Sequence, residues 1–312
     1  MVKKICVAAF AALALTGCNE NGAELQDVPS GEKIQLTVNV PDGSTKVTGT
    51  PADAKVNDVQ VFVFDRYGVY ETSSRASGSS LSLTCTSGEK QIMALVNAPQ
   101  ETGVSEISEL RSRISELKDC TAESIVMSGE ITKTLTASSS ITMQVERIAA
   151  RVAISRIKLD FEQEQHRQLP FSVKAIYLIN VAGDRVYLGS GTPSVWFNKA
   201  KYIAQTSPDF LYDAVTSGDI ANGSTYSKEH FFYCYPNVTA TKTRLVVETE
   251  IGGHTYYYPL TLDEVEANTA YTFDLTITRL GSDSPDVPVE DGSVKFIVTV
   301  KDWVQQNVSE TI

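Results

Sequence analysis

The chain begins with residues whose order suits covalent lipidation rather than catalysis. Two lysines precede a short apolar run that ends in the sequence LTGC at residues 15–18. The run is too short to span a bilayer, and small residues before a cysteine suit a peptidase that cuts once the thiol is acylated. We predict a lipoprotein signal peptide over residues 1–17, cleavage between Gly17 and Cys18, and acyl chains such as palmitate on Cys18 that anchor the precursor in the outer membrane. The alternative is an ordinary signal peptide followed by a chance cysteine.

Residues that could form a catalytic or metal site do not occur at the required spacings. The histidines show no HExxH or other pair that favours zinc, and the chain has no GxSxG turn, no P-loop and no GxGxxG after a strand. The acidic run LTLDEVEAN is typical of a solvated surface, and His166 lies in a charged stretch that indicates an exposed loop. We predict no enzymatic activity, no metal and no cofactor.

Charge and cysteine content exclude two further classes of protein. The formal net charge is −11, and loss of the two signal-peptide lysines leaves 25 basic and 38 acidic residues, or −13. Such a surface without basic clusters argues against nucleic-acid binding. Cys6 leaves with the signal peptide, and Cys85, Cys120 and Cys234 remain without CxxC spacing. This indicates neither a disulfide framework nor a metal cluster, and one disulfide stays open.

The elements that carry these residues are mostly β-strands. Apolar and polar residues alternate in IQLTVNV and LSLTC, and VQVFVF and many later segments also read as strands, separated at even intervals by turn residues. The segment 147–161 shifts its apolar phase near Ser155, which indicates a bulged strand. A helical period occurs over residues 105–117, with Ser105 as the expected N-cap. The pattern predicts an all-β fold of antiparallel β-sandwiches with one or few short helices.

The order of the segments predicts how the chain divides. A flexible polar tether covers residues 18–31 after the signal peptide. An N-terminal sandwich follows over 32–147, and its first strand occupies 33–40. A C-terminal sandwich covers 148–280, and residues 281–312 supply a loose linker and a last strand.

Two strands near the termini share one pattern, in which four apolar residues alternate over seven positions: Ile34, Leu36, Val38 and Val40, and then Val294, Phe296, Val298 and Val300. Either strand could complete a sandwich sheet in the same way. One interpretation is that the last strand of one molecule replaces the first strand of another and so builds a fibre. The alternative is that the last strand pairs within its own domain.

Several motifs along the chain carry a resemblance to a known family. In order, they are the LTGC motif, the IxLxVxV strand, RIAARVAISRIKL, YYYPLTL, AYTFDLTITRLGSDSPDVPVEDG and VKFIVTVKDWV. Over nearly its whole length the sequence resembles the fimbrillin family, the lipoprotein-derived subunits of type V pili in certain Gram-negative bacteria. The resemblance implies two transthyretin-like antiparallel β-sandwich domains, lipoprotein export, a place in a cell-surface fimbrium and a contribution to adhesion.

The resemblance also implies assembly by donor-strand exchange. A trypsin-like maturation protease removes the first strand, and a C-terminal strand of another subunit fills the vacated groove. Carried over to this chain, the displaced strand runs from Ile34 to Val40, and the donor strand comprises the four alternating residues from Val294 to Val300 together with Trp303. The implied partners are other fimbrial subunits in a head-to-tail polymer, the protease, and the outer membrane before cleavage.

The maturation cut is implied between Lys46 and Val47, in the loop after the first strand. The family's usual residue at this point is an arginine, so Lys46 leaves an arginine-specific protease in question. Arg66 and Arg75 lie later in the chain, and a cut at Arg66 would damage the strand VQVFVF.

The position of the subunit in a fimbrium is open. An intact last strand favours a stalk subunit, whereas a tip subunit would keep that strand folded onto itself, and an anchor would retain its lipid and stay uncut. A different class is a surface lipoprotein that binds glycans through Trp196 and the tyrosines of HTYYYPL, such as Tyr256. Aromatic residues at alternating positions more often pack within a sheet, so this interpretation ranks last.

Overall fold

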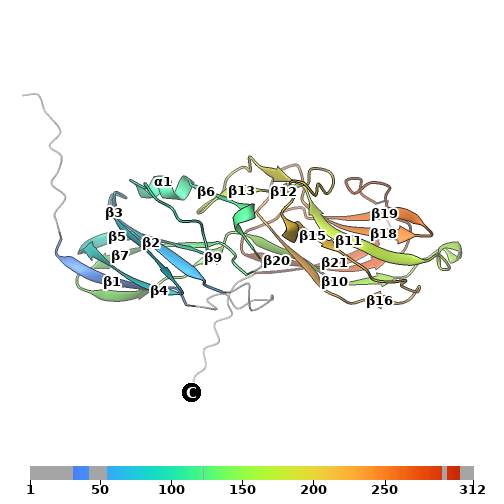
Figure 1. Ribbon diagram of the computed structural model, residues 1–312, viewed down its shortest axis with the longest axis horizontal. Helices are drawn as coiled ribbons and strands as arrows, with labels where there is room; N and C mark the ends of the chain where they lie inside the picture. The colour runs from blue at the N-terminus through green and yellow to red at the C-terminus, as the bar shows by residue number, and fades with distance from the viewer. Residues whose placement is uncertain (1–30, 42–54, 122, 290–293, 303–312) are drawn as a thin grey trace, which may run out of the picture. The chain divides into compact units, whose positions relative to one another are not determined.

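The computed structural model describes residues 31–41, 55–121, 123–289 and 294–302 (Figure 1). Strands dominate these ranges, which confirms the all-β fold expected from the sequence. Helical structure in them is confined to α1 (Ile107–Ser112) and the 3-10 turns η2 (Leu117–Asp119), η3 (Glu164–His166) and η4 (Asp209–Leu211). In these ranges no helix combines the length and hydropathy needed to cross a membrane.

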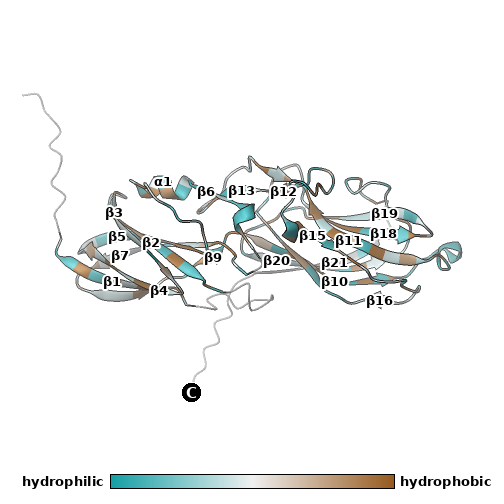
Figure 2. Cartoon of the chain, in the orientation of Figure 1, coloured by the Kyte–Doolittle hydropathy of each residue, from teal (hydrophilic) through white to brown (hydrophobic). Residues whose placement is uncertain are grey.

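Two sheets face each other in the first half of the chain. One has the order β4-β1-β8, formed by β4 (Ser80–Thr86), β1 (Lys33–Asn39) and β8 (Ser139–Thr142). The other has the order β3-β2-β5-β7-β9, formed by β3 (Tyr70–Ser77), β2 (Asp58–Asp65), β5 (Gly88–Val96), β7 (Met127–Leu135) and β9 (Glu146–Arg147). Figure 2 shows apolar residues along strands such as β2, with hydrophilic residues at its ends. The apolar side chains of both sheets share one buried cluster, which includes Leu36, Val61 and Ile92.

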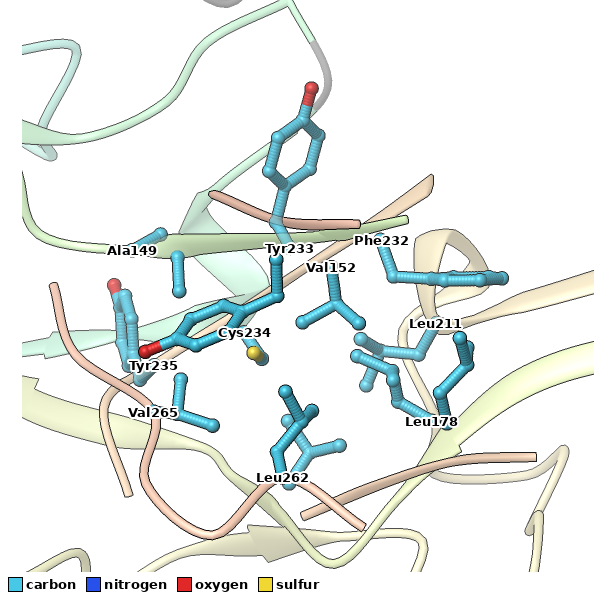
Figure 3. Packing of buried hydrophobic residues seen from close by; sticks show 14 of the residues in the cluster. Ala149, Val152, Leu178, Leu211, Phe232, Tyr233, Cys234, Tyr235, Leu262 and Val265 are labelled. Carbon is cyan, nitrogen blue, oxygen red and sulfur yellow. The ribbon is translucent and has the colours of Figure 1, made fainter. Parts of the chain in front are cut away.

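Two larger sheets form in the second half. The first has the order β16-β10-β20-β21, with β17 also paired to β10; its strands are β16 (Thr225–Tyr226), β10 (Ala150–Leu159), β20 (Thr269–Ile277), β21 (Val294–Asp302) and β17 (His230–Cys234). The second has the order β15-β11-β18-β19, formed by β15 (Tyr212–Ala214), β11 (Phe171–Ile179), β18 (Arg244–Ile251) and β19 (His254–Thr261). Figure 3 shows the buried packing around Val152, Leu178 and Phe232, which come from β10, β11 and β17.

Short strand pairs join segments that are distant in sequence. Strand β12 (Val181–Ala182) pairs with β14 (Trp196–Phe197), and β13 (Asp184–Val186) pairs with β6 (Ile114–Glu116). The described residues from Glu32 onward form one compact unit. The division of this unit into sandwiches at residue 147 therefore stays a prediction.

The predicted bulge is present in β10. Its register against β20 shifts between Ile154 and Arg156, so Ser155 is the extra residue. The Ser155 hydroxyl donates to the carbonyl oxygen of Phe273 at 3.0 Å. The change of apolar phase in the sequence thus has the expected structural cause.

The helix predicted over residues 105–117 is much shorter in the structure. It ends at Ser112, and Arg113 is extended with φ −65° and ψ 143°. Ser105 is not the N-cap residue, which is Glu106; instead the Ser105 hydroxyl donates to Glu109 at 3.0 Å. The second half of the predicted helix becomes β6 and η2 because β6 finds a partner in β13, far along the chain.

Candidate functional site

The first strand, β1, occupies a groove between two partners. It pairs antiparallel with β4, where Leu36 faces Leu83, and parallel with β8, where Val38 faces Ile141. Its apolar residues are buried: Ile34 is 6% exposed, and Leu36, Val38 and Val40 are 0% exposed. A strand with this burial pattern is an integral part of its sandwich core.

Polar contacts fix the register of β1 on its other face. The Thr37 and Ser82 hydroxyls lie 2.8 Å apart, and the Asn39 side-chain amide donates to the Ser140 hydroxyl at 2.9 Å. Burying four aliphatic side chains contributes about 6–12 kcal/mol, which is comparable with the whole stability of a domain, about 5–15 kcal/mol. The groove would therefore be strongly destabilising if it were left empty.

The last strand, β21, lies at the edge of the chain's own sheet. It pairs antiparallel with β20 from Ile277 opposite Val294 to Thr269 opposite Asp302. Val298 is half-buried and packs against the main core, whereas its neighbour Ile297 is 67% exposed. In this structure the last strand therefore pairs with a strand of its own chain, which is the alternative to donation that the sequence left open.

The segment before β21 is bound to the sheet that contains β19. The backbone amides of Tyr257 and Ser282 donate to each other's carbonyl oxygens at 2.8 and 2.9 Å. Asp286 forms an ion pair with Arg244 at 2.5 Å and accepts a hydrogen bond from the Asn180 amide at 3.3 Å. This differs from the loose linker predicted from its polar composition.

Several predicted site residues lie outside the described ranges. They are Gly17 and Cys18 of the signal cleavage site, Lys46 and Val47 of the maturation site, and Trp303 after the last strand. For Val294, Phe296 and Val300 the structure describes the backbone pairing alone. The roles of all these residues stay predictions.

The structure does describe the surroundings of the implied cut on its C-terminal side. The carbonyl oxygen of Lys55 accepts a hydrogen bond from the Asn97 amide at 2.8 Å, and the backbone amide of Asn57 donates to the same side chain at 2.8 Å. Arg75 lies within β3 and forms an ion pair with Asp58 at 2.7 Å. These basic residues are held by the fold and are poor protease sites.

The sequence did not reveal a hydrogen-bonded chain in which a buried histidine, His230, links two half-buried residues, Tyr226 and Asp213. The Nδ1 atom of His230 lies 2.8 Å from a carboxylate oxygen of Asp213, and its Nε2 atom lies 2.9 Å from the Tyr226 hydroxyl. His230 is 3% exposed, and both ring nitrogens have partners, so the histidine joins β15, β16 and β17. No sequence motif marks this set, because the three residues come from separate short strands.

In the ranges that the structure covers, cysteines and acidic residues form neither a reactive thiol site nor a metal site. Cys85, Cys120 and Cys234 are free thiols and are all buried. Burial raises the pKa of Cys234 to about 12 and also raises the pKa of Cys120, which keeps both thiols protonated and unreactive. No three ligand-type side chains in these ranges are placed to hold a metal ion.

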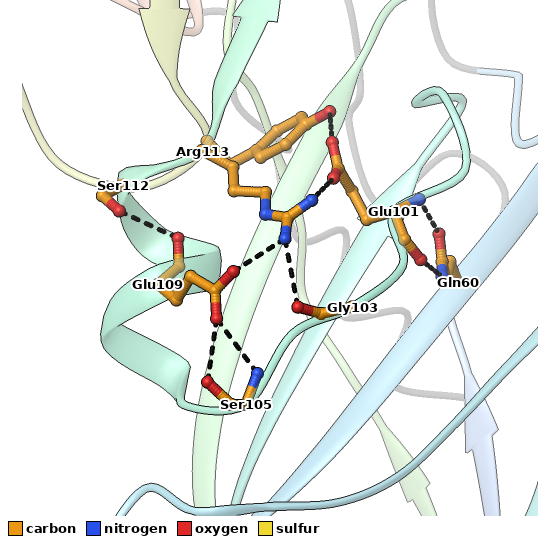
Figure 4. A network of polar contacts seen from close by, with 8 residues as sticks. Gln60, Glu101, Gly103, Ser105, Glu109, Ser112 and Arg113 are labelled. Atoms are coloured by element: carbon orange, nitrogen blue, oxygen red, sulfur yellow. Dashed lines mark hydrogen bonds and ion pairs between the residues drawn. The ribbon is translucent and has the colours of Figure 1, made fainter.

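Polar residues also connect α1 to strands of both halves. Figure 4 shows Glu101 between Gln60 and Arg113, whose guanidinium also reaches Glu109. The Tyr187 hydroxyl donates to Glu101 at 2.9 Å, and the Ser128 hydroxyl donates to the carbonyl oxygen of Tyr187 at 2.6 Å. This network is structural, since each group is satisfied by a neighbour within the fold.

Comparisons with known proteins agree with this architecture. A family model described as the major fimbrial subunit protein (FimA) matches residues 34–156. No curated protein matches the sequence.

Solved structures extend the likeness over most of the chain. A candidate cell adhesion protein of Bacteroides eggerthii has a TM-score of 0.71 at 21% identity, covering 88% of this chain and 98% of its own. A fimbrilin (FimA) of Porphyromonas gingivalis has a TM-score of 0.64 at 15% identity, covering 87% and 98%. The tip fimbrial protein Mfa3 of the same organism, with a C-terminal truncation, has a TM-score of 0.55 at 12% identity, covering 87% and 100%. The chain therefore has the fold of these fimbrial and adhesion proteins, and its match to the FimA family over residues 34–156 confirms the fimbrillin resemblance.

Proposed function

We propose that this protein is a structural subunit of a cell-surface fimbrium, exported as an outer membrane lipoprotein and assembled by protease-triggered donor-strand exchange. The observation that carries the proposal is the burial of β1 between two partner strands. Four apolar side chains of this terminal strand fill a groove between β4 and β8, and the implied cut follows the strand at Lys46. Removal of β1 would leave an apolar groove that a strand of matching pattern can fill.

The C-terminal strand has the properties of a donor in this scheme. It pairs on one side alone, with β20, and it repeats the alternation of β1. Released from its edge position, it offers a free ladder of backbone groups to another subunit. The family match to the major fimbrial subunit covers residues 34–156 and supports the fimbrial role of the region that contains β1.

Limited proteolysis tests the proposal. Trypsin treatment of the purified protein should give a chain that starts at Val47 and that forms a ladder of oligomers on a gel. Lys46→Ala should stay uncut at this position and stay monomeric. Lys55→Ala is the matched control and should behave as the wild type, because Lys55 is held by Asn97. Assembled fimbriae whose subunits begin at Cys18 would overturn the proposal.

A tip subunit is the second candidate, because β21 is paired within its own sheet. A tip subunit accepts a donor strand after cleavage but does not donate one. The same mixing experiment separates the two: a stalk subunit forms long ladders alone, whereas a tip subunit stays monomeric and caps a stalk partner.

A further inference from the structure

Two neighbouring cavities open between two loops of the second half of the chain. Their volumes are about 340 and 510 Å³, and they share Thr192, Pro193 and Thr239 in their walls. The loop 189–193 has the sequence GSGTP and separates β13 from β14, and the other wall is the turn at 236–241. Because the two cavities share these walls, one elongated ligand can occupy both.

Arg185 lines the first cavity as a cation without an acidic partner. Its guanidinium donates to the carbonyl oxygens of Val186, Ile148 and Gly189 at 3.1, 2.6 and 2.9 Å. A guanidinium has five N–H donors, so two are left over. Burial lowers the pKa of Arg185 from its ordinary value, yet an arginine stays charged in proteins. A half-buried cation of this kind is stabilised by an anion.

The neighbouring aspartate cannot supply that anion. The Asp184 carboxylate accepts hydrogen bonds from the backbone amides of Ser194 and Val195 at 2.8 and 2.9 Å, and a third from the Ser194 hydroxyl at 2.5 Å. Asp184 lines the same cavity as Arg185, but no ion pair joins the two side chains in the described part of the chain. Asp184 therefore holds the loop in place and leaves the charge of Arg185 unpaired.

The second cavity adds an aromatic ring and another cation. Trp196 is half-buried in its wall, and Lys199 is exposed beside it. Within the described part of the chain Lys199 forms no ion pair, and the backbone amides of Ser190, Gly191 and Thr192 have no acceptor. In a chain of net charge −11, two unpaired cations around one cleft mark a site for an acidic ligand.

We propose that this cleft binds an acidic saccharide, with its carboxylate or sulfate on Arg185 and a sugar ring against Trp196. The exposed carboxylate of Glu266 lies in the wall of the first cavity and is an acceptor for hydroxyl groups. A ligand that bears both an anionic group and several hydroxyls meets all of these features, whereas inorganic anions and plain fatty acids do not. Stacking of a sugar on an indole adds affinity without further charge.

Of the aromatic residues that the sequence offers for sugar binding, the cleft uses Trp196. Tyr256, the other aromatic residue considered for sugar binding, is half-buried and packs against the main core. It does not line either cavity. The site rests on loops and not on an aromatic sheet face.

The test measures binding of defined oligosaccharides to the intact protein. A panel carrying uronate, sialate or sulfate groups is compared with neutral counterparts of equal length. The tightest acidic binder is then titrated against a Trp303→Phe variant, in which Trp196 is the remaining tryptophan and reports by fluorescence. We expect an acidic member to bind at least about tenfold more tightly than its neutral counterpart and to lose this advantage in high salt.

Variants then assign the site. Lys199→Gln and Trp196→Ala alter a surface side chain and a cavity wall, and each should weaken binding at least about tenfold. Arg185→Gln should abolish the preference for acidic members, with its folding checked by circular dichroism because Arg185 also bonds three carbonyls. Lys201→Gln is the matched control, since Lys201 is exposed and lines neither cavity. The proposal is overturned if acidic and neutral members bind alike, or if binding persists in both Lys199→Gln and Trp196→Ala.

Discussion

Single residues in this fold are governed by burial, and Glu248 is an instructive case. Its carboxylate accepts a hydrogen bond from the Tyr177 hydroxyl at 3.4 Å, beside stacked rings of Tyr177, Tyr202 and Tyr212. Desolvation raises the pKa of Glu248, and the Tyr177 hydrogen bond only partly opposes this. The folded chain thus holds this proton more tightly than the unfolded chain, so the stabilisation is present at acid pH and is lost as pH rises through the folded pKa.

Replacing Glu248 by glutamine tests whether the charged carboxylate lowers the stability of the folded chain as pH rises. Glu248→Gln removes the charge and keeps an acceptor for Tyr177, so we expect it to be more stable than the wild type at neutral pH. The advantage should vanish near pH ~3, below the unfolded-state pKa of about 4.3, where the carboxyl is protonated in both states. Urea unfolding at the two pH values measures the difference. Glu250→Gln, on the same strand but exposed and paired with Lys174, is the control and should show little change. An equal gain at both pH values would contradict the assignment.

At the scale of elements, the edge strand β21 has two unlike faces. Val298 packs against the core and Ile297 points to solvent at 67% exposure. Because an edge strand pairs on one side, its loss leaves the remaining strands of the sheet paired with each other.

Charge substitutions on the two faces separate folding from assembly. Val298→Asp should give a folded monomer, judged by circular dichroism, that no longer forms oligomer ladders after trypsin treatment, because the charge cannot enter an apolar groove. Ile297→Asp places the same charge one residue earlier on the exposed face and should assemble as the wild type. Normal fibre yield from Val298→Asp would argue against β21 as the donor strand.

How far the sequence could predict these elements depends on where their partners lie. Strands that alternate apolar and polar residues, such as β1 and β18, were predicted with nearly correct bounds. Strand β3 was missed because its sequence YETSSRAS has no apolar face, and it is held as an edge strand by β2 alone. The helix was overextended because β6 obtains its pairing from β13, about seventy residues later, which local periodicity cannot reveal.

The candidate sites could likewise be predicted only where local sequence, and not a distant partner, decides the structure. The burial of β1 could be predicted from its own alternation, whereas the position of β21 could not, because the same pattern fits either its own sheet or another molecule. The cleft at Arg185 and Trp196 depends on two loops distant in sequence, and no short motif marks it. The sequence signal that was present, a glycine-rich turn after a strand, is too common to identify a site.

At the scale of the whole molecule, every cysteine in the described part of the chain is a buried free thiol. The chain has five cysteines, of which Cys6 lies in the predicted signal peptide and Cys18 is the predicted lipid carrier. The other three are free and buried. With the proposed signal cleavage and acylation of Cys18, the mature chain should therefore carry three thiols that are all protected by the fold.

Thiol titration checks this expectation. The native lipoprotein should react slowly with a thiol reagent, and after unfolding it should titrate three groups per chain, because burial and the raised pKa values of Cys120 and Cys234 no longer protect them. A chain expressed from residue 19 onward lacks both Cys6 and Cys18; it is the control and should give the same number if the wild-type Cys18 sulfur is acylated. Four groups in the unfolded wild type would show that Cys18 is not lipidated.

The mixed ladder around β1 has a directional consequence. Since β1 runs antiparallel to β4 but parallel to β8, a guest segment that enters in the same sense retains both sets of backbone bonds. A guest that enters in the reverse sense must rebuild both sets in another arrangement. Each joint would thus distinguish forward from backward, and a filament made of such joints would acquire a single polarity, with one kind of end for growth and another for attachment.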